Sequence, residues 1–254
     1  MSGRVVCLLA FSAALAWAQT KPRIVVIAHR GEHLTHPENT MEAFQGAVAA
    51  GADFFELDVR TTQDGKLVLM HDGSVNRMTN GSGNVAAMTF AAVRRLEVGG
   101  MQTKVPTFDE ALAFARGRIG IYVDSKSISA ADAIAAIQAH DMQNHVVIYG
   151  GLGYLRQIAK TKPDMKVMPE AGSPDQLRSL LAELPLRVVA FDAKDFNDET
   201  IAVAQAAKLD IYVDRLGPAD HPAAWQDAID RGATGIQTDH PAKLVGYLKL
   251  KGYR

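Results

Sequence analysis

The sequence predicts an α/β fold, a (β/α)8 TIM barrel with a small insertion after the second strand. Short runs rich in β-branched residues alternate with helical patterns, in roughly eight β-then-α units. About 235 residues remain after an N-terminal leader, which suits one such barrel. Polar residues capable of chemistry follow several of the apolar runs, where barrel active sites lie. An open, doubly wound sheet is the main alternative.

Residues 1–18 are expected to be a secretory signal peptide and not part of the fold. Arg4 provides a short positive region, residues 5–15 are apolar, and Ala16-Trp17-Ala18 is a small-x-small cleavage site. Cleavage is predicted after Ala18, with an uncleaved membrane anchor as the alternative. The apolar run is too short for a spanning helix, so we expect a periplasmic or secreted protein.

The barrel domain is expected to occupy residues 19–254. Because β-branched runs are typical of buried parallel strands, we place strands at 24–27, 54–59, 119–123, 146–149, 166–168, 187–191, 211–213 and 234–237. Helices are expected at 39–50, 107–116, 129–140, 152–161, 174–183, 198–208, 221–231 and 240–250. Asn39 or Thr40 is expected to cap the first helix, and Gly51 to end it.

One interval, residues 73–105, is too long for a βα loop. It follows a strand-like run at 67–70 and contains turn residues at 80–83 and a short helical pattern near 89–96. We interpret it as an insertion packed beside the barrel mouth.

Composition excludes several classes of function. The formal net charge of −1 gives no basic surface for nucleic acid or an anionic membrane. Cys7, the only cysteine, lies in the leader, so the mature chain has no disulfide, zinc-thiolate site or cysteine nucleophile. No later apolar run approaches the length of a spanning helix, so no stable membrane insertion is expected. The sequence carries no indication of an oligomeric state.

Three carboxylates are candidates for a metal site. Glu56 and Asp58 are spaced i, i+2 on one strand and therefore point to the same side. Asp124 lies at the end of the next barrel strand. Oxygen ligands without cysteine or clustered histidine favour Ca²⁺ or Mg²⁺ over zinc. Salt bridges at the barrel rim are the simpler alternative, and the nearby histidines favour the metal.

His29 and His71 are candidates for proton transfer, because an imidazole can accept and donate a proton near neutral pH. Arg30 and Lys126 are candidates for binding the non-bridging oxygens of a phosphate. Together with a divalent ion, these groups suit hydrolysis of a phosphodiester, a small-molecule substrate. A structural role is expected for the other histidines, His33, His36, His140, His145, His221 and His240.

The chain resembles the glycerophosphodiester phosphodiesterase family over nearly all of its mature length. The matching motifs are His29-Arg30-Gly31, Pro37-Glu38-Asn39-Thr40, Glu56-Leu57-Asp58-Val59-Arg60, Thr62-Gln63-Asp64-Gly65, His71-Asp72, Asn80-Gly81-Ser82-Gly83, Val105-Pro106-Thr107-Phe108, Asp124-x-Lys126 and Gln237-Thr238-Asp239-His240-Pro241. The resemblance implies a TIM barrel and metal-dependent hydrolysis of a glycerophosphodiester to sn-glycerol 3-phosphate and an alcohol. It implies metal binding by Glu56, Asp58 and Asp124, acid/base catalysis by His29 and His71, and phosphate contact by Arg30 and Lys126.

The sequence departs from the family pattern at two positions. Asp124 stands where the family more often has a glutamate, so the ion is expected to shift or to gain a water ligand. The end of the strand at 211–213 continues with Asp214-Arg215-Leu216-Gly217 in place of a W-T-x-N pattern that helps to wall the substrate pocket. These charged residues would alter the substrate pocket, and an ion pair between Asp214 and Arg215 is the simpler alternative.

Two alternative functions stay open from the sequence. One is a lysophospholipase D or sphingomyelinase D-like phosphodiesterase using the same site, which would need an apolar channel; the insertion offers Val85, Met88, Phe90, Val93 and Leu96, although packing explains them equally well. The other is a non-catalytic periplasmic phosphodiester-binding protein on the same fold.

Overall fold

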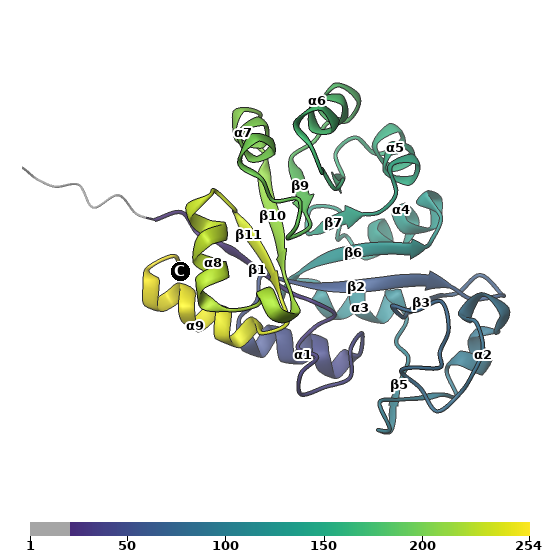
Figure 1. Cartoon of the computed structure of the whole chain (residues 1–254). Coiled ribbons are helices and arrows are strands. Elements are labelled where there is room, and N and C mark those ends of the chain that lie inside the picture. The colour runs from purple at the N-terminus through teal and green to yellow at the C-terminus, as the bar shows by residue number, and fades with distance from the viewer. Residues whose placement is uncertain (1–20) are drawn as a thin grey trace, which may run out of the picture.

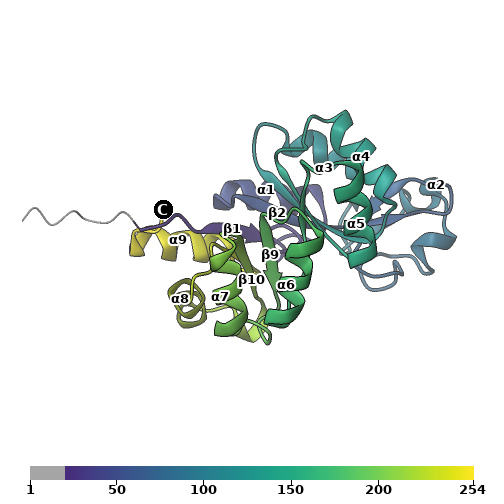
Figure 2. The same ribbon diagram turned by 90° about the horizontal axis from the view of Figure 1, so that it is seen from above.

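The computed structural model describes residues 21–254, and the predicted signal peptide lies outside the described residues. Within this range, eight parallel strands form a barrel surrounded by helices (Figures 1 and 2). The strands are β1 (Val25–Ala28), β2 (Phe54–Thr61), β6 (Gly120–Ser127), β7 (Val146–Tyr149), β8 (Lys166–Met168), β9 (Val188–Phe191), β10 (Asp210–Arg215) and β11 (Gly235–Thr238). The predicted fold class is confirmed.

The outer layer consists of helices that follow the strands in alternation. They are α1 (Met41–Ala50), α3 (Phe108–Ala115), α4 (Ala130–Ala139), α5 (Leu152–Thr161), α6 (Pro174–Glu183), α7 (Asp198–Ala206), α8 (Pro222–Asp230) and α9 (Pro241–Lys251). Thr40 is the N-cap of α1 and accepts a hydrogen bond from the Ala43 N–H, while Gly51 ends the helix with φ of 79°. A positive φ at this position is one that glycine adopts without steric cost.

The strands are hydrogen-bonded in the order β8-β7-β6-β2-β1-β11-β10-β9. The remaining seam lies between β8 and β9. There the Ala190 N–H donates to the Pro169 carbonyl at 3.0 Å, and the Ala171 N–H donates to the Ala190 carbonyl at 3.1 Å. A short parallel bridge from Glu170 to Ala190 thus closes the barrel, which brings the strand ends of β8, β9 and β10 to the same mouth as those of β1, β2 and β6.

The strands β2 and β6 run further than the sequence predicts. They stay paired past the barrel rim, with Asp58 beside Asp124 in register and an irregularity at Val59 and Arg60. The reason is that β2 also pairs on its other edge with the antiparallel strand β3 (Leu67–Leu69), so its backbone groups are satisfied beyond the last apolar position. Asp124, which the sequence places just after its strand, therefore lies inside β6.

The segment after β3 forms a small unit at the end of the molecule opposite α9 (Figures 1 and 2). It contains a 3₁₀ helix η1 (Val85–Ala87), helix α2 (Phe90–Val93) and a hairpin of β4 (Glu97–Val98) and β5 (Thr103–Lys104). Its apolar residues pack in a cluster with Val68 of β3: Met70, Val75, Val85, Val93, Val98 and Val105 are buried there, with Met78, Met88, Phe90 and Leu96 against them. This supports packing as the role of these side chains.

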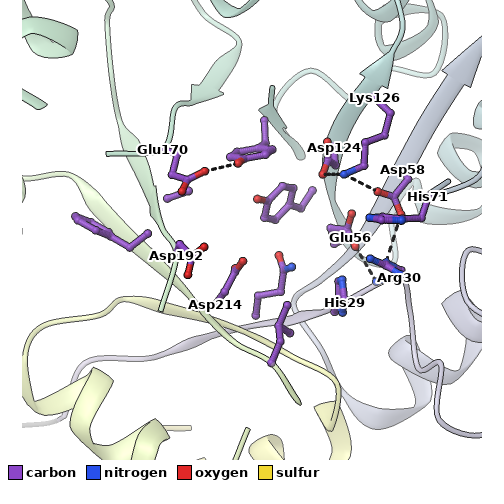
Figure 3. A pocket seen from close by; sticks show the side chains of 16 residues that line it. His29, Arg30, Glu56, Asp58, His71, Asp124, Lys126, Glu170, Asp192 and Asp214 are labelled. Atoms are coloured by element: carbon purple, nitrogen blue, oxygen red, sulfur yellow. Dashed lines mark hydrogen bonds and ion pairs between the residues drawn. The ribbon is translucent and has the colours of Figure 1, made fainter. Parts of the chain in front are cut away.

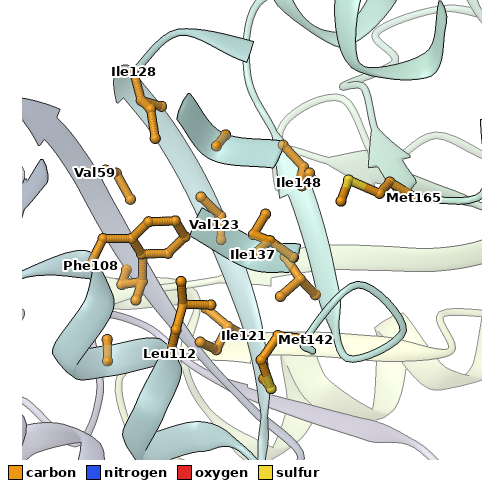
Figure 4. Packing of buried hydrophobic residues seen from close by; sticks show 14 of the residues in the cluster. Val59, Phe108, Leu112, Ile121, Val123, Ile128, Ile137, Met142, Ile148 and Met165 are labelled. Carbon is orange, nitrogen blue, oxygen red and sulfur yellow. The ribbon is translucent and has the colours of Figure 1, made fainter. Parts of the chain in front are cut away.

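The main core lies between the sheet and the helices. Figure 4 shows Phe108 and Leu112 of α3 packed against Ile121 and Val123 of β6 and Ile137 of α4. A separate cluster that includes Ile27, Tyr122, Met168 and Tyr212 fills the barrel interior. Among the described residues, no helix combines the length and apolar character needed to cross a bilayer.

Truncation of a core leucine provides a test of this packing. Leu112 in α3 has no exposed surface, and Leu112→Ala is expected to lower the free energy of unfolding by about 3 kcal/mol through lost burial and a cavity. The matched control is Leu250→Ala in α9, where the leucine is 84% exposed and the expected change is below about 0.5 kcal/mol. Chemical denaturation measures both, and equal effects would contradict the assignment of α3 to the core.

Candidate active site

A pocket of about 180 Å³ lies at the carboxyl ends of the barrel strands (Figure 3). Each residue that the sequence singles out for chemistry lines it: His29, Arg30, Glu56, Asp58, His71, Asp124 and Lys126. The pocket also contains residues to which the sequence assigns no role, including Tyr122, Tyr149, Glu170, Asp192 and Gln237. Residues on all eight barrel strands or the loops that follow them therefore share one cavity, as the topology predicts.

Glu56, Asp58 and Asp124 converge in this pocket. One carboxylate oxygen from each lies within 4.8 Å of the others, a spacing that can hold one metal ion. Glu56 and Asp58 are 3% and 1% exposed. Burial, together with repulsion by Asp58 and Asp124, raises the pKa of Glu56 well above its usual range. The shorter side chain of Asp124 still reaches the group, because the β2–β6 register sets it beside Asp58.

The loop after β1 fixes two of these carboxylates by hydrogen bonds. The Arg30 N–H donates to Glu56 Oε2 at 2.8 Å. Asn39 donates from its amide to Asp58 Oδ2 at 2.7 Å and accepts from the Asp58 N–H at 3.0 Å. Arg30 and Asn39 both have a left-handed backbone, with φ of 52° and 57°, which is uncommon outside glycine. The sequence offers Asn39 as one of two candidate caps of the first helix; in the structure Thr40 is the cap, and Asn39 orients Asp58.

Two cations face the three carboxylates. Lys126 Nζ lies 2.7 Å from Asp124 Oδ2 and 3.3 Å from Asp58 Oδ1, and Arg30 Nε lies 3.6 Å from Asp58 Oδ2. Burial opposes the charge on Lys126, yet its bond to Asp124 and the surrounding carboxylates leave the pKa of Lys126 raised. Lys126 therefore remains charged at the site where a phosphate anion is expected.

The guanidinium of Arg30 is positioned by residues other than the three candidate metal ligands. It donates to Glu38 at 3.1 Å, and Glu38 also accepts from Arg77 at 2.7 Å. Arg77 belongs to the inserted segment and pairs in addition with Asp72 at 2.7 Å. The insertion thus fixes Glu38 and Asp72 at the mouth of the pocket through Arg77. No sequence pattern indicates this role.

His29 is paired with a carboxylate that the sequence analysis cites only within a motif. Its Nδ1 lies 2.8 Å from Asp239 Oδ1, just after β11. Burial lowers the pKa of His29, although Asp239 opposes the shift. Burial opposes ionisation of Asp239, but hydrogen bonds from His29 and from the Gly217 N–H lower its pKa to about 2. An ionised Asp239 holds the proton of neutral His29 on Nδ1, which leaves Nε2 able to accept one.

His71 has a similar arrangement after β3. Its Nδ1 lies 2.8 Å from Asp72 Oδ1, and hydrogen bonds from Arg77 and His71 lower the pKa of Asp72. The ring is partly exposed at the pocket edge, with 35% of its side chain accessible. Both candidate histidines thus have one ring nitrogen fixed by an anionic carboxylate.

The wall across the pocket from Arg30 and Lys126 is acidic (Figure 3). It is formed by Glu170, Asp192 and Asp214. The expected pairing of Asp214 with Arg215 does not form between their side chains, because neighbours on a strand point to opposite sides. Asp214 lines the pocket, whereas Arg215 extends to the α8 side, where it donates to the Ala224 carbonyl at 3.3 Å and lies 3.5 Å from Asp227.

Comparisons with known proteins point to one family of phosphodiesterases. A model of the glycerophosphoryl diester phosphodiesterase family matches residues 29–243. A glycerophosphodiester phosphodiesterase of Caldanaerobacter subterraneus is 29% identical, over 91% of this chain and all of the relative. The crystal structure of an Agrobacterium tumefaciens glycerophosphodiester phosphodiesterase matches with a TM-score of 0.78 and 27% identity, over 88% of this chain and 99% of that one.

A third match has the same fold at lower identity. An Oleispira antarctica phosphodiesterase, solved in complex with the product sn-glycerol-3-phosphate, aligns with a TM-score of 0.80 and 20% identity, over 89% of this chain and 96% of that one.

The barrel and its site define a phosphodiester hydrolase. The chain belongs to the glycerophosphoryl diester phosphodiesterase family.

The repulsion among Glu56, Asp58 and Asp124 predicts that Glu56→Gln changes the stability of the protein in a pH-dependent way. Because the pKa of Glu56 is higher in the folded state than its ordinary value of 4.5, ionisation of Glu56 destabilises the fold. The protein therefore loses stability as the pH rises from 4.5 through the pKa of the folded state. Glutamine does not titrate, so in chelator at pH 8 the variant is expected to unfold at a temperature higher by about 3 °C.

Thermal unfolding between pH 4 and pH 8 measures this effect. The difference between Glu56→Gln and the native protein should shrink toward the acid end. The exposed Glu199→Gln in α7 is the control and should show a difference of about 1 °C or less at each pH. A variant less stable than the native protein at pH 8 would show that repulsion among the carboxylates is outweighed by their bonds.

Proposed function

We propose that this protein is an exported, metal-dependent phosphodiesterase that hydrolyses glycerophosphodiesters to sn-glycerol 3-phosphate and an alcohol. The observation that carries the proposal is the meeting, in one pocket, of three convergent carboxylates, two cationic side chains and two histidines that each bond a carboxylate. The product bound in the Oleispira antarctica phosphodiesterase supports glycerol 3-phosphate as the phosphorylated product of the reaction. Export is proposed from the predicted signal peptide.

The donor set fits a hard divalent cation. Glu56, Asp58 and Asp124 are the residues that would hold it, and they offer only oxygen. The buried negative charge that raises the pKa of Glu56 is what a divalent ion neutralises. When bound, such an ion supplies Lewis-acid polarisation of a phosphate oxygen and favours the deprotonated form of an attacking oxygen. Ca²⁺ and Mg²⁺ both suit this donor set.

Proton transfer is assigned to the two histidines. His29 is neutral because burial lowers its pKa, and with Nδ1–H bonded to Asp239 its Nε2 can accept the proton of the attacking hydroxyl or water. His71, whose Nδ1 is held by Asp72, is placed to donate a proton to the departing alkoxide. Arg30 and Lys126 orient the phosphate and balance charge on its non-bridging oxygens.

Substitution of either histidine is expected to abolish most of the activity. His29→Ala and His71→Ala should each lower kcat for release of glycerol 3-phosphate from a glycerophosphodiester by about 10³-fold, because each removes one proton transfer. Neither should lower the melting temperature enough to account for the loss. His140→Ala is the control, since His140 ends α4 and bonds Asp109 away from the pocket. Native-like turnover by either variant would reject that histidine's role.

Removal of the metal is expected to stop catalysis reversibly. Activity after dialysis against a chelator should fall at least about 100-fold and should return on addition of Ca²⁺ or Mg²⁺. Chelation without effect would contradict metal dependence.

Parallel assays on glycerophosphodiester, lysophospholipid and sphingomyelin measure the substrate class, and glycerophosphodiesters are expected to be hydrolysed fastest. Tight binding of diesters without turnover in any metal would indicate a binding protein.

A further inference from the structure

Three successive strands each carry a carboxylate at the mouth of the barrel. Glu170 follows β8, Asp192 follows β9, and Asp214 lies near the end of β10. The register pairs Val213 with Phe191, so the next residues, Asp214 and Asp192, are neighbours at the same level of the sheet. All three carboxylates line the pocket opposite Arg30 and Lys126 (Figure 3). This acidic wall is separate from the carboxylates proposed to hold the metal.

Asp214 on this wall and Gln237 beside it each have an acceptor without a partner. Among residues 21–254, no hydrogen bond or ion pair reaches the Asp214 carboxylate, whereas Glu170 accepts from the Tyr149 hydroxyl at 2.6 Å and Asp192 pairs with the exposed Lys194 at 3.3 Å. Gln237, beside Asp214 in register on β11, is only 5% exposed, and its Oε1 has no donor. An acceptor without a donor is unfavourable in a buried site, and the unpaired carboxylate of Asp214 makes a cationic ligand the complementary one.

The electrostatics of Asp214 agree with such a ligand. Burial and the repulsion of Asp192 and Glu170 raise the pKa of Asp214 to about 7. A cation placed between these carboxylates would relieve the repulsion and hold them ionised. Aromatic rings complete the surroundings, since Tyr122 and Tyr149 line the same pocket with ring centroids 5.8 Å apart. Carboxylates and aromatic faces together are a favourable environment for an ammonium group.

The spacing of the wall favours an organic cation over a second metal ion. Two groups in the described part of the chain have ligand atoms within 4.8 Å of one another, namely Glu56 with Asp58 and Asp124, and His29 with His33 and Asp239. Glu170, Asp192 and Asp214 do not form such a group. Their charge is spread over three strands, which suits a cation larger than a bare metal ion.

We propose that Glu170, Asp192 and Asp214 bind the ammonium group of the substrate's alcohol, so that the preferred substrates are glycerophosphodiesters of amino alcohols. This inference rests on the proposed function, because it places the phosphate against Arg30, Lys126 and the three metal-site carboxylates. Such a diester is zwitterionic, with an anionic phosphate and a cationic head group. With a divalent ion held by Glu56, Asp58 and Asp124, the wall that carries Arg30 and Lys126 would have a net positive charge, opposite in sign to the acidic wall.

The test compares the native protein with Asp214→Asn on three diesters. Glycerophosphocholine and glycerophosphoethanolamine carry a cation, and glycerophosphoglycerol carries none. The native protein is expected to show kcat/KM at least about tenfold higher for the cationic pair, and Asp214→Asn is expected to bring that ratio close to one, mainly by raising KM for the cationic substrates. Asp210→Asn, at the exposed opposite end of the same strand, is the control and should leave the ratio unchanged.

The outcomes separate this inference from the proposed function. An equal loss on all three diesters in Asp214→Asn would overturn the inference, because it would show that the wall binds the glycerol hydroxyls common to all of them. A native protein without preference for cationic diesters would overturn it as well. If no diester is hydrolysed, the proposed function fails. Calorimetric titration with choline then tests by itself whether the acidic wall binds an ammonium group. Choline binding by the native protein that is lost in Asp214→Asn would support the acidic wall as an ammonium site, and no choline binding would reject it.

Discussion

Mutual repulsion among Glu56, Asp58 and Asp124 is the constraint around which the site is built. The register of β2 with β6 sets Asp58 beside Asp124, and the pleat of β2 sets Glu56 on the same side. Three carboxylates brought together with little solvent are unfavourable without compensation. The surrounding structure supplies it through the Arg30 N–H, the Asn39 amide and the Lys126 ammonium.

Compensation of this charge explains the shape of the first loop. Arg30 and Asn39 both adopt left-handed backbone conformations, and in those conformations one donates its N–H to Glu56 and the other clamps Asp58 by two hydrogen bonds. Backbone strain of this kind persists where the surroundings fix it, commonly at functional sites. The inserted segment adds a further support, because Arg77 bonds both Glu38, which holds Arg30, and Asp72, which holds His71.

The barrel and the metal-site candidates could be predicted because they depend on local patterns. Apolar β-branched runs mark the strands, and the i, i+2 spacing of Glu56 and Asp58 fixes their common side. The boundaries of β2 and β6 were harder, because their extension depends on pairing with β3 and with each other. Asp239, Arg77, Glu170 and Asp192 were missed as site residues for a similar reason. Each acts through partners more than 20 residues away, such as His29 or Glu38, or through cross-strand neighbours.

Calorimetric titration of chelator-treated protein with Ca²⁺ and with Mg²⁺ tests the central claim most directly. If the three carboxylates hold a single ion, the native protein binds one ion per chain, Asp124→Asn loses that binding, and Asp214→Asn retains it. Full binding by Asp124→Asn, or loss of binding confined to Asp214→Asn, would place the cation on the other wall and contradict the account.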